Sequence, residues 1–329
     1  MNIKSSLVVL SVTAILVSTV SVRAQVATPS IQSFEQWCQQ KDTLPAGTKK
    51  TVEVLLEKAD TQDCKAADLQ LNSLKELSLD YEQIGDLKPL ASLTNLTSLG
   101  LRSNQIRDVQ PLESLTNLTD LVLEGNQISD VKPLESLTNL TRLYLTSNQI
   151  IDVQPLASLT NLTVLDLMSN QISNVQPLAS LTNLTSLNLY FNQISNVQPL
   201  ASLTNLIYLG LGSSLGSSQI RSNQISDVQP LANLTNLTVL YLEGNQISDV
   251  QPLASLTNLT ELYLNNNQIS DVQPLASLTN LTELYLYNNQ ISDVKPLSSL
   301  TNLTILNLSE NATLTNRICP VRRELICIF

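Results

Sequence analysis

Two kinds of polar side chain recur in this sequence about every 22 residues, and both could take part in chemistry. One is an asparagine such as Asn126. The other is an aspartate three residues before a proline, as Asp130 stands before Pro133, replaced by Asn174 and Asn196 in two copies. Rows of amides or carboxylates could bind a repetitive ligand or metal ions. Each copy supplies only one carboxylate, so we favour structural roles, with amides pairing buried backbone groups and aspartates capping turns.

The sequence contains no histidine. This removes the commonest general base, the commonest metal ligand and the usual pH switch. The carboxylates are spread along the repeats, and we find no nucleophile–base pair and no paired acids in a predicted cleft. We therefore expect no catalytic residues, no metal site and no cofactor, and a binding protein rather than an enzyme.

The four cysteines fall into two pairs, Cys38 with Cys64 and Cys319 with Cys327, one on each side of the repeats. In an exported protein this placement favours two structural disulfides, although four cysteines allow three connectivities. A zinc site is the alternative, but neither the spacing nor a histidine supports it.

The N-terminal residues have the pattern of a secretory signal peptide. Lys4 is followed by an apolar run over residues 7–20, and Val22 and Ala24 supply the small residues of a cleavage site. We predict cleavage after Ala24 and a secreted or periplasmic protein. A retained membrane anchor is the alternative, but the run is shorter than the roughly 20 residues a span requires. We expect no membrane insertion after cleavage.

The chain is acidic, with a formal net charge of −10. Removal of residues 1–24 takes away Lys4 and Arg23 and no acid, so the mature protein is more acidic still. Nucleic acids and anionic membranes require clustered basic residues, and both are therefore disfavoured as partners.

All these polar rows belong to one repeated phrase, of which residues 115–136 are a typical copy. Its Leu-x-Leu segment alternates inward and outward as a short strand does, and its proline suits the start of a helical turn on the outer side. Eleven such strands, from Leu77 to Leu306, would lie side by side in a parallel sheet. One copy buries too little apolar surface to fold alone, so the copies must stack as a solenoid.

The pattern Leu-x-x-Leu-x-Leu-x-x-Asn-x-Ile-x-Asp-x-x-Pro-Leu covers about residues 71–311 and resembles the leucine-rich repeat. The resemblance is to the 22-residue bacterial class typified by internalins. It implies an α/β fold, a right-handed solenoid or horseshoe with a concave parallel sheet of about 11 strands and short 3₁₀ turns on the convex side. It also implies protein recognition, usually on the concave face, but it does not name a partner.

Two segments outside the repeats are expected to cover the ends of the core. Residues 25–70 are predicted to form an N-terminal cap of short helices closed by the first disulfide. Within it, Ser33 and Gln36 have the spacing of a capping box, and residues 51–58 indicate a second helix. Residues 312–329 are predicted to form a C-terminal cap around the second disulfide.

One repeat, residues 203–233, is nine residues longer than the others. The additional material lies within residues 210–222, where Leu-Gly-Ser-Ser and Gln-Ile are duplicated, so either Ser218 or Asn223 takes the asparagine position. A duplication by slippage explains it. A binding loop on the rim of the concave face is the functional hypothesis.

Tyrosine is concentrated at outward positions of the predicted strands, where the repeat leaves the residue free to vary. Tyrosine gives rigid amphipathic contact area and is enriched in binding hot spots. The competing interpretation is that tyrosine favours strands and stacks on its neighbours. The predicted ligand-binding residues on the concave face are Tyr144, Tyr190, Tyr208, Tyr241, Tyr263, Tyr285, Tyr287, Glu243, Glu261 and Glu283.

We therefore predict an exported, non-enzymatic module that recognises a protein partner, such as a basic patch on a cell-surface protein, and that is a monomer. Two alternatives remain. One is a glycan-binding adhesin that uses the same tyrosines, and the other is a structural or stress protein without a specific ligand.

Overall fold

The computed structural model describes residues 31–213, 223–321 and 326–329. The predicted signal peptide, residues 1–24, lies outside the described residues. The chain divides into two compact units, residues 1–31 and 32–329, and the second contains every helix and strand described below. Within the described ranges, no helix combines the length and apolarity needed to cross a bilayer.

Three α-helices precede the repeats: α1 (Phe34–Gln39), α2 (Ala46–Lys58) and α3 (Cys64–Ser73). The capping box predicted for α1 is confirmed. The Ser33 hydroxyl accepts from the backbone N–H of Gln36, and the Gln36 side chain accepts from the backbone N–H of Ser33. A single 3₁₀ turn, η1 (Lys41–Thr43), joins α1 to α2.

The other two helices differ from the prediction, because tertiary contacts determine where α2 begins and bury one side of α3. Helix α2 begins at Ala46, earlier than predicted, and the hydroxyls of Thr48 and Thr51 in its first turns donate to the side chain and the carbonyl of Asp86 in the first repeat. Helix α3 was not predicted. It places Leu71, expected as the first residue of the repeats, fully buried on a helix.

Two disulfides fix the ends of this unit. Cys38 of α1 is bonded to Cys64 at the start of α3, with 5.5 Å between their Cα atoms. Cys319 is bonded to Cys327, with 5.7 Å between the Cα atoms. Of the three connectivities that the sequence allows, the structure therefore has the one that keeps each pair on its own side of the repeats.

The repeats form a single parallel sheet in which the strands follow one another in chain order. The eleven predicted strands are confirmed, each with its inward leucine at the centre. With one further strand, β12, the sheet consists of β1 (Glu76–Ser78), β2 (Ser98–Gly100), β3 (Asp120–Val122), β4 (Arg142–Tyr144), β5 (Val164–Asp166), β6 (Ser186–Asn188), β7 (Tyr208–Gly210), β8 (Val239–Tyr241), β9 (Glu261–Tyr263), β10 (Glu283–Tyr285), β11 (Ile305–Asn307) and β12 (Cys327–Ile328).

The twelfth strand was not predicted, because β12 lies outside the repeat pattern. Its residues pair with β11, and the Leu308 backbone N–H donates to the Ile328 carbonyl at 2.7 Å. The Cys319–Cys327 bond ties this strand to the preceding chain. The C-terminal segment therefore extends the sheet by one strand.

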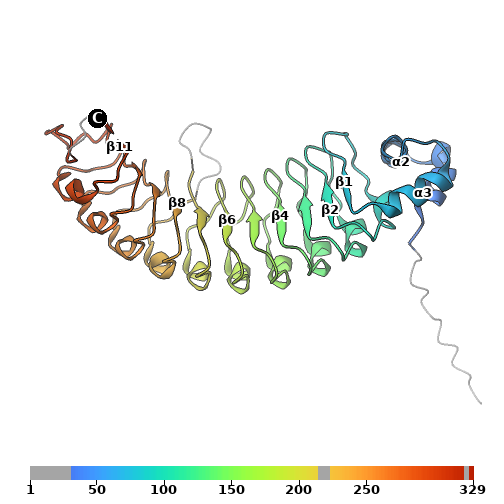
Figure 1. The fold of residues 1–329 in the computed structure, drawn as a ribbon, viewed down its shortest axis with the longest axis horizontal. Coiled ribbons are helices and arrows are strands. Elements are labelled where there is room, and N and C mark those ends of the chain that lie inside the picture. Colours follow the sequence, from blue (N-terminus) through green and yellow to red (C-terminus); the bar gives the residue numbers. More distant parts are fainter. Residues whose placement is uncertain (1–30, 214–222, 322–325) are drawn as a thin grey trace, which may run out of the picture. The chain divides into compact units, whose positions relative to one another are not determined.

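A row of 3₁₀ helices, each with a proline as its second residue, lies apart from the row of strands (Figure 1). The sheet forms the concave side of the horseshoe and the 3₁₀ turns its convex side, as predicted. The turns are η2 (Lys88–Leu90), η3 (Gln110–Ser114), η4 (Lys132–Ser136), η5 (Gln154–Ser158), η6 (Gln176–Ser180), η7 (Gln198–Ser202), η8 (Gln229–Asn233), η9 (Gln251–Ser255), η10 (Gln273–Ser277) and η11 (Lys295–Ser299).

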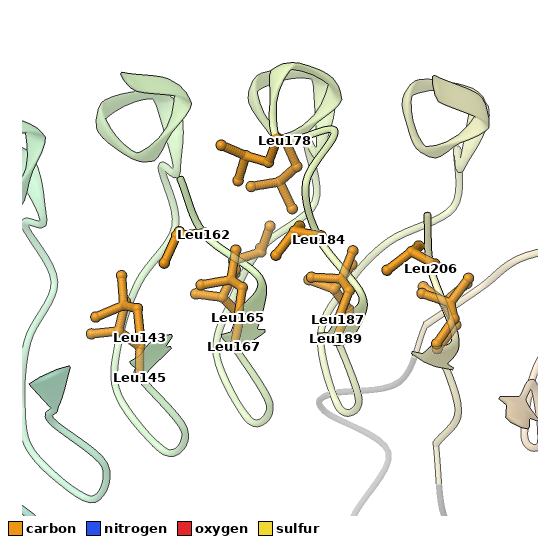
Figure 2. Packing of buried hydrophobic residues seen from close by; sticks show 14 of the residues in the cluster. Leu143, Leu145, Leu162, Leu165, Leu167, Leu178, Leu184, Leu187, Leu189 and Leu206 are labelled. Carbon is orange, nitrogen blue, oxygen red and sulfur yellow. The ribbon is translucent and has the colours of Figure 1, made fainter. Parts of the chain in front are cut away.

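The core is a stack of leucine layers, one layer for each repeat. Figure 2 shows Leu143, Leu165 and Leu187 in equivalent places in successive repeats, and all three are fully buried. A single cluster of apolar residues extends from Phe34 in α1 to Val321. Because each leucine packs against the same position of its neighbours, no repeat is a folding unit by itself.

The asparagine row has the structural role that the sequence predicts. The Asn126 side-chain NH₂ donates to the carbonyls of Leu101 in the preceding repeat and Leu123 in its own, at 2.9 and 3.0 Å. Its Oδ1 accepts from the backbone N–H of Ile106 at 3.0 Å. Each amide therefore joins two repeats and satisfies buried backbone groups.

The aspartate row is also structural. Asp130 Oδ1 accepts from the backbone N–H of Lys132 at 2.8 Å, and Asn174 does the same for Gln176 at 3.0 Å. The side chain thus caps the turn that leads into each 3₁₀ helix. The amide oxygen of asparagine accepts the same hydrogen bond as the carboxylate oxygen of aspartate, so either residue fits this position.

Candidate functional site

The outward surface of the sheet carries a column of three tyrosine rings, in which one neighbouring pair is tilted by 32° and the other is stacked. Tyr241, Tyr263 and Tyr285 are the third residues of β8, β9 and β10, and the parallel register sets them side by side. Their ring centroids are 4.3 Å and 4.4 Å apart, close to the strand spacing of about 4.8 Å. We call these residues the tyrosine column. Its inner ring faces cover one another, so the column presents ring edges and hydroxyl groups to its surroundings.

Two further tyrosines join the column at its N-terminal end. The rings of Tyr190 and Tyr208 each lie 5.6 Å from the ring of Tyr241, in tilted orientations. Both rings precede β8 in the chain, and together with the column they make a continuous aromatic surface over β6 to β10. We call these five residues the tyrosine surface.

Two glycines make room for Tyr190. A Cβ atom on Gly210 would lie 2.7 Å from Cδ2 of Tyr190, and one on Gly212 would lie 2.6 Å from its Cε1. The Tyr190 ring therefore lies over the backbone of the seventh repeat, where any side chain at these positions would displace it.

The Tyr190 hydroxyl reaches across this repeat to the eighth and donates to Glu243 Oε1 at 2.7 Å. The other oxygen of Glu243, Oε2, is buried and has no hydrogen-bond partner in the part of the chain that the structure describes. Burial raises the pKa of Glu243 above its ordinary value, against the lowering effect of the Tyr190 hydrogen bond. Burial and the carboxylate also raise the pKa of Tyr190, so its hydroxyl stays a donor.

Two more carboxylates flank the tyrosine column and accept from its hydroxyls. Glu283 Oε2 accepts from Tyr263 at 3.0 Å and from Tyr285 at 3.4 Å. Glu261 Oε2 accepts from Tyr241 at 3.5 Å. None of the ion pairs found among the described residues includes Glu243, Glu261 or Glu283. Within the described ranges, the carboxylates therefore have hydroxyl partners but no basic partner.

The phenol groups of this surface are neutral at physiological pH. Burial is the main cause and raises the pKa of Tyr208 to about 12. Burial, with the neighbouring carboxylates, also raises the pKa of Tyr241, Tyr263 and Tyr285. Desolvation next to negative charge disfavours phenolate, so the hydroxyls remain hydrogen-bond donors.

An amide cluster adjoins the C-terminal end of the tyrosine surface. The Asn266 side chain donates to the Tyr287 hydroxyl at 3.3 Å and accepts from the Asn288 side chain at 2.8 Å. Both asparagines have positive φ angles, 58° and 50°, which asparagine adopts more readily than most residues. Sequence reasoning placed Tyr287 on this face but did not foresee the amide contacts.

Tyr144 stands apart from the other predicted site residues. In the register of β4 its neighbours are Val122 and Asp166, and none of the ring pairs among the described residues includes it. The structure thus brings together most of the predicted tyrosines and all three glutamates, and separates Tyr144 from them.

The N-terminal part of the concave face is organised by ion pairs that sequence reasoning missed. Arg102 Nη2 lies 2.6 Å from Glu124 Oε2, and Arg142 forms an ion pair with Asp120. In each pair the two residues are 22 positions apart. Opposite charges at that offset are the signal that could have revealed both pairs.

Asn223, not Ser218, takes the asparagine position of the long repeat. Its side-chain NH₂ donates to the carbonyls of Leu189 and Leu211, both at 3.0 Å, and its backbone N–H donates to Ser213 Oγ at 2.9 Å. The repeat pattern therefore continues up to Ser213 and resumes at Asn223, and the additional residues are 214–222. These lie outside the described residues, so the rim-loop hypothesis stays a prediction.

Two hollows lie away from the tyrosine surface. One, of about 520 Å³, is lined by Val294, Lys295, Leu314 and Ile318 near the C-terminal segment. The other, of about 560 Å³, is lined by residues of the convex side, including Lys132 and Asp152. Among the described residues, no group of three or more Cys, Asp or Glu side chains is placed to hold a metal ion.

A family model for leucine-rich repeats, which describes two copies of the repeat, matches the chain almost continuously from residue 94 to residue 319. The matched ranges are residues 94–136, 138–180, 182–233, 219–255, 235–277, 257–297 and 279–319. None of the curated proteins matches the sequence.

Solved structures agree with the family match. An internalin, inlF, from Listeria monocytogenes is 32% identical, over 83% of this chain and 97% of that chain, with a TM-score of 0.64. The functional domain of InlJ from Listeria monocytogenes shares the fold at 23% identity, over 87% of this chain and 63% of that one, with a TM-score of 0.65. The plant peptide hormone receptor RGFR1 shares it at 23% identity, over 74% and 45%, with a TM-score of 0.60.

Proposed function

The chain belongs to the leucine-rich-repeat family, in the internalin-like 22-residue class, and we propose that it is a non-enzymatic module that binds a protein partner. The proposed binding site is the concave surface over β6 to β10. The observation that carries the proposal is the tyrosine surface. Its five rings are in continuous contact and lie beside three carboxylates that have no basic partner among the described residues. Aromatic residues held rigidly by their neighbours are typical of binding hot spots.

The geometry of the tyrosine column favours a protein over a glycan. A sugar stacks on an open ring face, whereas the faces of Tyr263 are covered on both sides by Tyr241 and Tyr285. Ring edges, hydroxyls and carboxylates suit the mixed polar and apolar surface of a protein. The plant receptor with this fold was solved in complex with RGF2, which supports a recognition role for such a scaffold.

We infer that the protein acts outside the cytoplasm. The two disulfides form and persist in oxidising compartments, which supports export by the predicted signal peptide with cleavage after Ala24. We further propose that the N-terminal helices and the C-terminal disulfide segment serve as caps of the repeat core, and that the protein is a monomer.

The test is affinity capture with the secreted form of the full-length chain, immobilised and exposed to cell-surface proteins at physiological salt, in parallel with a glycan array. We expect a retained protein whose binding falls by at least about tenfold in a Tyr263→Ser, Tyr285→Ser double variant. Tyr144→Ser is the matched control, because it removes a concave tyrosine outside the tyrosine surface, and it should leave binding unchanged.

The other outcomes decide against the proposal. Glycan binding that depends on Tyr263 and Tyr285, without a retained protein, would establish the adhesin alternative. Equal losses in the double variant and in Tyr144→Ser would show that the tyrosine surface is not the site. No retained ligand of either kind would favour a structural role.

A further inference from the structure

Like charges stand directly opposite each other beside the tyrosine column. Glu261 and Glu283 are the first residues of β9 and β10, and the register pairs them as cross-strand neighbours. At the same position of β3 and β4 stand Asp120 and Arg142, which form an ion pair. Opposite charges at this position stabilise a sheet and like charges destabilise it. The C-terminal part of the concave face therefore carries an electrostatic cost that the N-terminal part avoids.

Nothing among the described residues offsets that cost with a positive charge. The partners of Glu261 and Glu283 are the hydroxyls of the tyrosine column, which donate hydrogen bonds but carry no charge.

The spacing of the two opposed carboxylates suits one kind of cation. Neighbouring strands are about 4.8 Å apart, so a single planar group with several N–H donors can contact both carboxylates at once. A guanidinium has five such donors in a fixed fork and stays charged at every physiological pH, whereas an ammonium is a compact, strongly hydrated point charge. The neutral tyrosine hydroxyls already hold the carboxylates in place, so little ordering is required on binding.

We propose that the protein partner presents an arginine-bearing segment to this face, with a guanidinium bridging Glu261 and Glu283 over the edge of the tyrosine column. The inference rests on the proposed function and specifies its partner chemistry. It commits to a basic protein segment for two reasons. The face carries carboxylates, and in the part of the chain that the structure describes the opposed pair has no counter-charge, whereas the equivalent pair on β3 and β4 has one.

The test uses a synthetic fluorescein-labelled peptide of alternating glycine and arginine, titrated with the full-length secreted chain and followed by fluorescence anisotropy. A peptide with citrulline in place of every arginine keeps the shape and removes the charge. We expect the citrulline peptide to bind at least about tenfold more weakly, and a lysine peptide to fall between the two. Equal binding of the arginine and citrulline peptides would overturn the proposal.

Matched variants locate the effect. Glu261→Gln with Glu283→Gln should weaken binding of the arginine peptide by about tenfold or more. Glu113→Gln with Glu135→Gln removes the same charge from exposed positions of η3 and η4 on the convex side, and binding should change less than about twofold. Equal losses in the two double variants would mean general attraction to an acidic protein and would contradict the assigned site.

A charge exchange excludes unfolding as the cause. Glu283→Arg recreates within the protein the arrangement of Asp120 and Arg142, so it should raise the Tm slightly while abolishing peptide binding. Retention of peptide binding by this variant would also overturn the proposal.

The failures of the two proposals are distinguishable. Tyrosine-dependent capture of a protein that is insensitive to salt and to Glu261→Gln with Glu283→Gln would leave the proposed function standing and refute the arginine inference. Loss of the tyrosine dependence would refute both.

Discussion

The two ends of the concave face share a backbone and a core but treat their outward charges in opposite ways. On β2 to β4 the outward side chains satisfy one another through the Arg102–Glu124 and Asp120–Arg142 pairs. On β8 to β10 aromatic rings stack in a column, and like-charged carboxylates stand opposite each other. Because the leucine core is the same at both ends, the difference lies in the outward positions alone. We propose that the end whose carboxylates have no basic partner among the described residues is the one that binds the partner.

The largest expected effect comes from adding a side chain at equivalent glycines of the two ends. Gly125 and Gly244 take the same place before the asparagine row, with φ angles of 67° and 69°. The nearest atom to a Cβ on Gly125 would be the Ser103 hydroxyl oxygen at 3.1 Å, whereas a Cβ on Gly244 would collide with the backbone carbonyl of Ser213. We expect Gly244→Ala to cost about 3 kcal/mol and Gly125→Ala about 1 kcal/mol, measured by urea unfolding. Equal costs would show that the eighth repeat is no more tightly constrained than the third.

The second effect measures the stacking itself. Tyr263 has a ring neighbour on both sides, tilted toward Tyr241 and stacked on Tyr285, and each aromatic pair contributes roughly 0.5–1.5 kcal/mol beyond its buried area. We expect Tyr263→Ser to lower the free energy of unfolding by about 2 kcal/mol. Tyr144→Ser, which removes an unstacked ring from β4, should cost less than about 1 kcal/mol. If both substitutions cost the same, the column adds nothing to stability.

The third effect depends on pH and concerns Glu243. Burial raises its pKa in the folded chain, so the unfolded chain loses this proton first as pH rises. The free energy of unfolding therefore falls as pH rises from the ordinary glutamate pKa, about 4.3, to the raised pKa of the folded chain. Glu243→Gln imitates the protonated form.

Thermal unfolding of the wild type and of Glu243→Gln across this pH range tests the assignment. The Tm of the variant, relative to that of the wild type, should rise with pH. A constant difference would mean that Glu243 does not titrate differently in the folded state, and that the Tyr190 bridge holds an ordinary carboxylate.

The smallest expected effect comes from two substitutions that exchange the charge patterns of the two ends. Arg142→Glu places like charges on β3 and β4, and Glu283→Arg places opposite charges on β9 and β10. We expect a loss of about 0.5 kcal/mol for the first and a gain of similar size for the second. Both should shrink in 1 M salt, where the Debye length is about 3 Å. The same sign for both variants would remove electrostatics as the source of the difference.

Much of the fold could be predicted, because the repeat makes local and tertiary signals agree. Leu99 and Leu121 are the central residues of β2 and β3, and the equivalent leucine is central in the other repeat strands. The amide of Asn126 joins two repeats, as the equivalent asparagines do. Segments without the repeat were predicted less well. Helix α2 begins at Ala46, where Thr48 reaches Asp86, and β12 pairs only because the chain returns to β11.

For the candidate site, the sequence indicated which face to examine but not how its residues combine. Tyr241, Tyr263 and Tyr285 are 22 residues apart, so their adjacency follows from the period. The reach of Tyr190 to Glu243 does not, because it passes over a whole repeat through space left by two glycines. No periodic argument pairs residues two repeats apart.

The sequence by itself determined the solenoid, its strand register, the asparagine and aspartate rows and the face that carries the tyrosines. It could do so because each buried leucine and each capping side chain contacts the same position of an adjacent copy, and one spacing describes every such contact. Only the tertiary structure decided which outward side chains satisfy one another and which have no counter-charge among the described residues. Those contacts depend on strand spacing, ring orientation and the room that Gly210 and Gly212 leave, and these arise once the repeats are stacked.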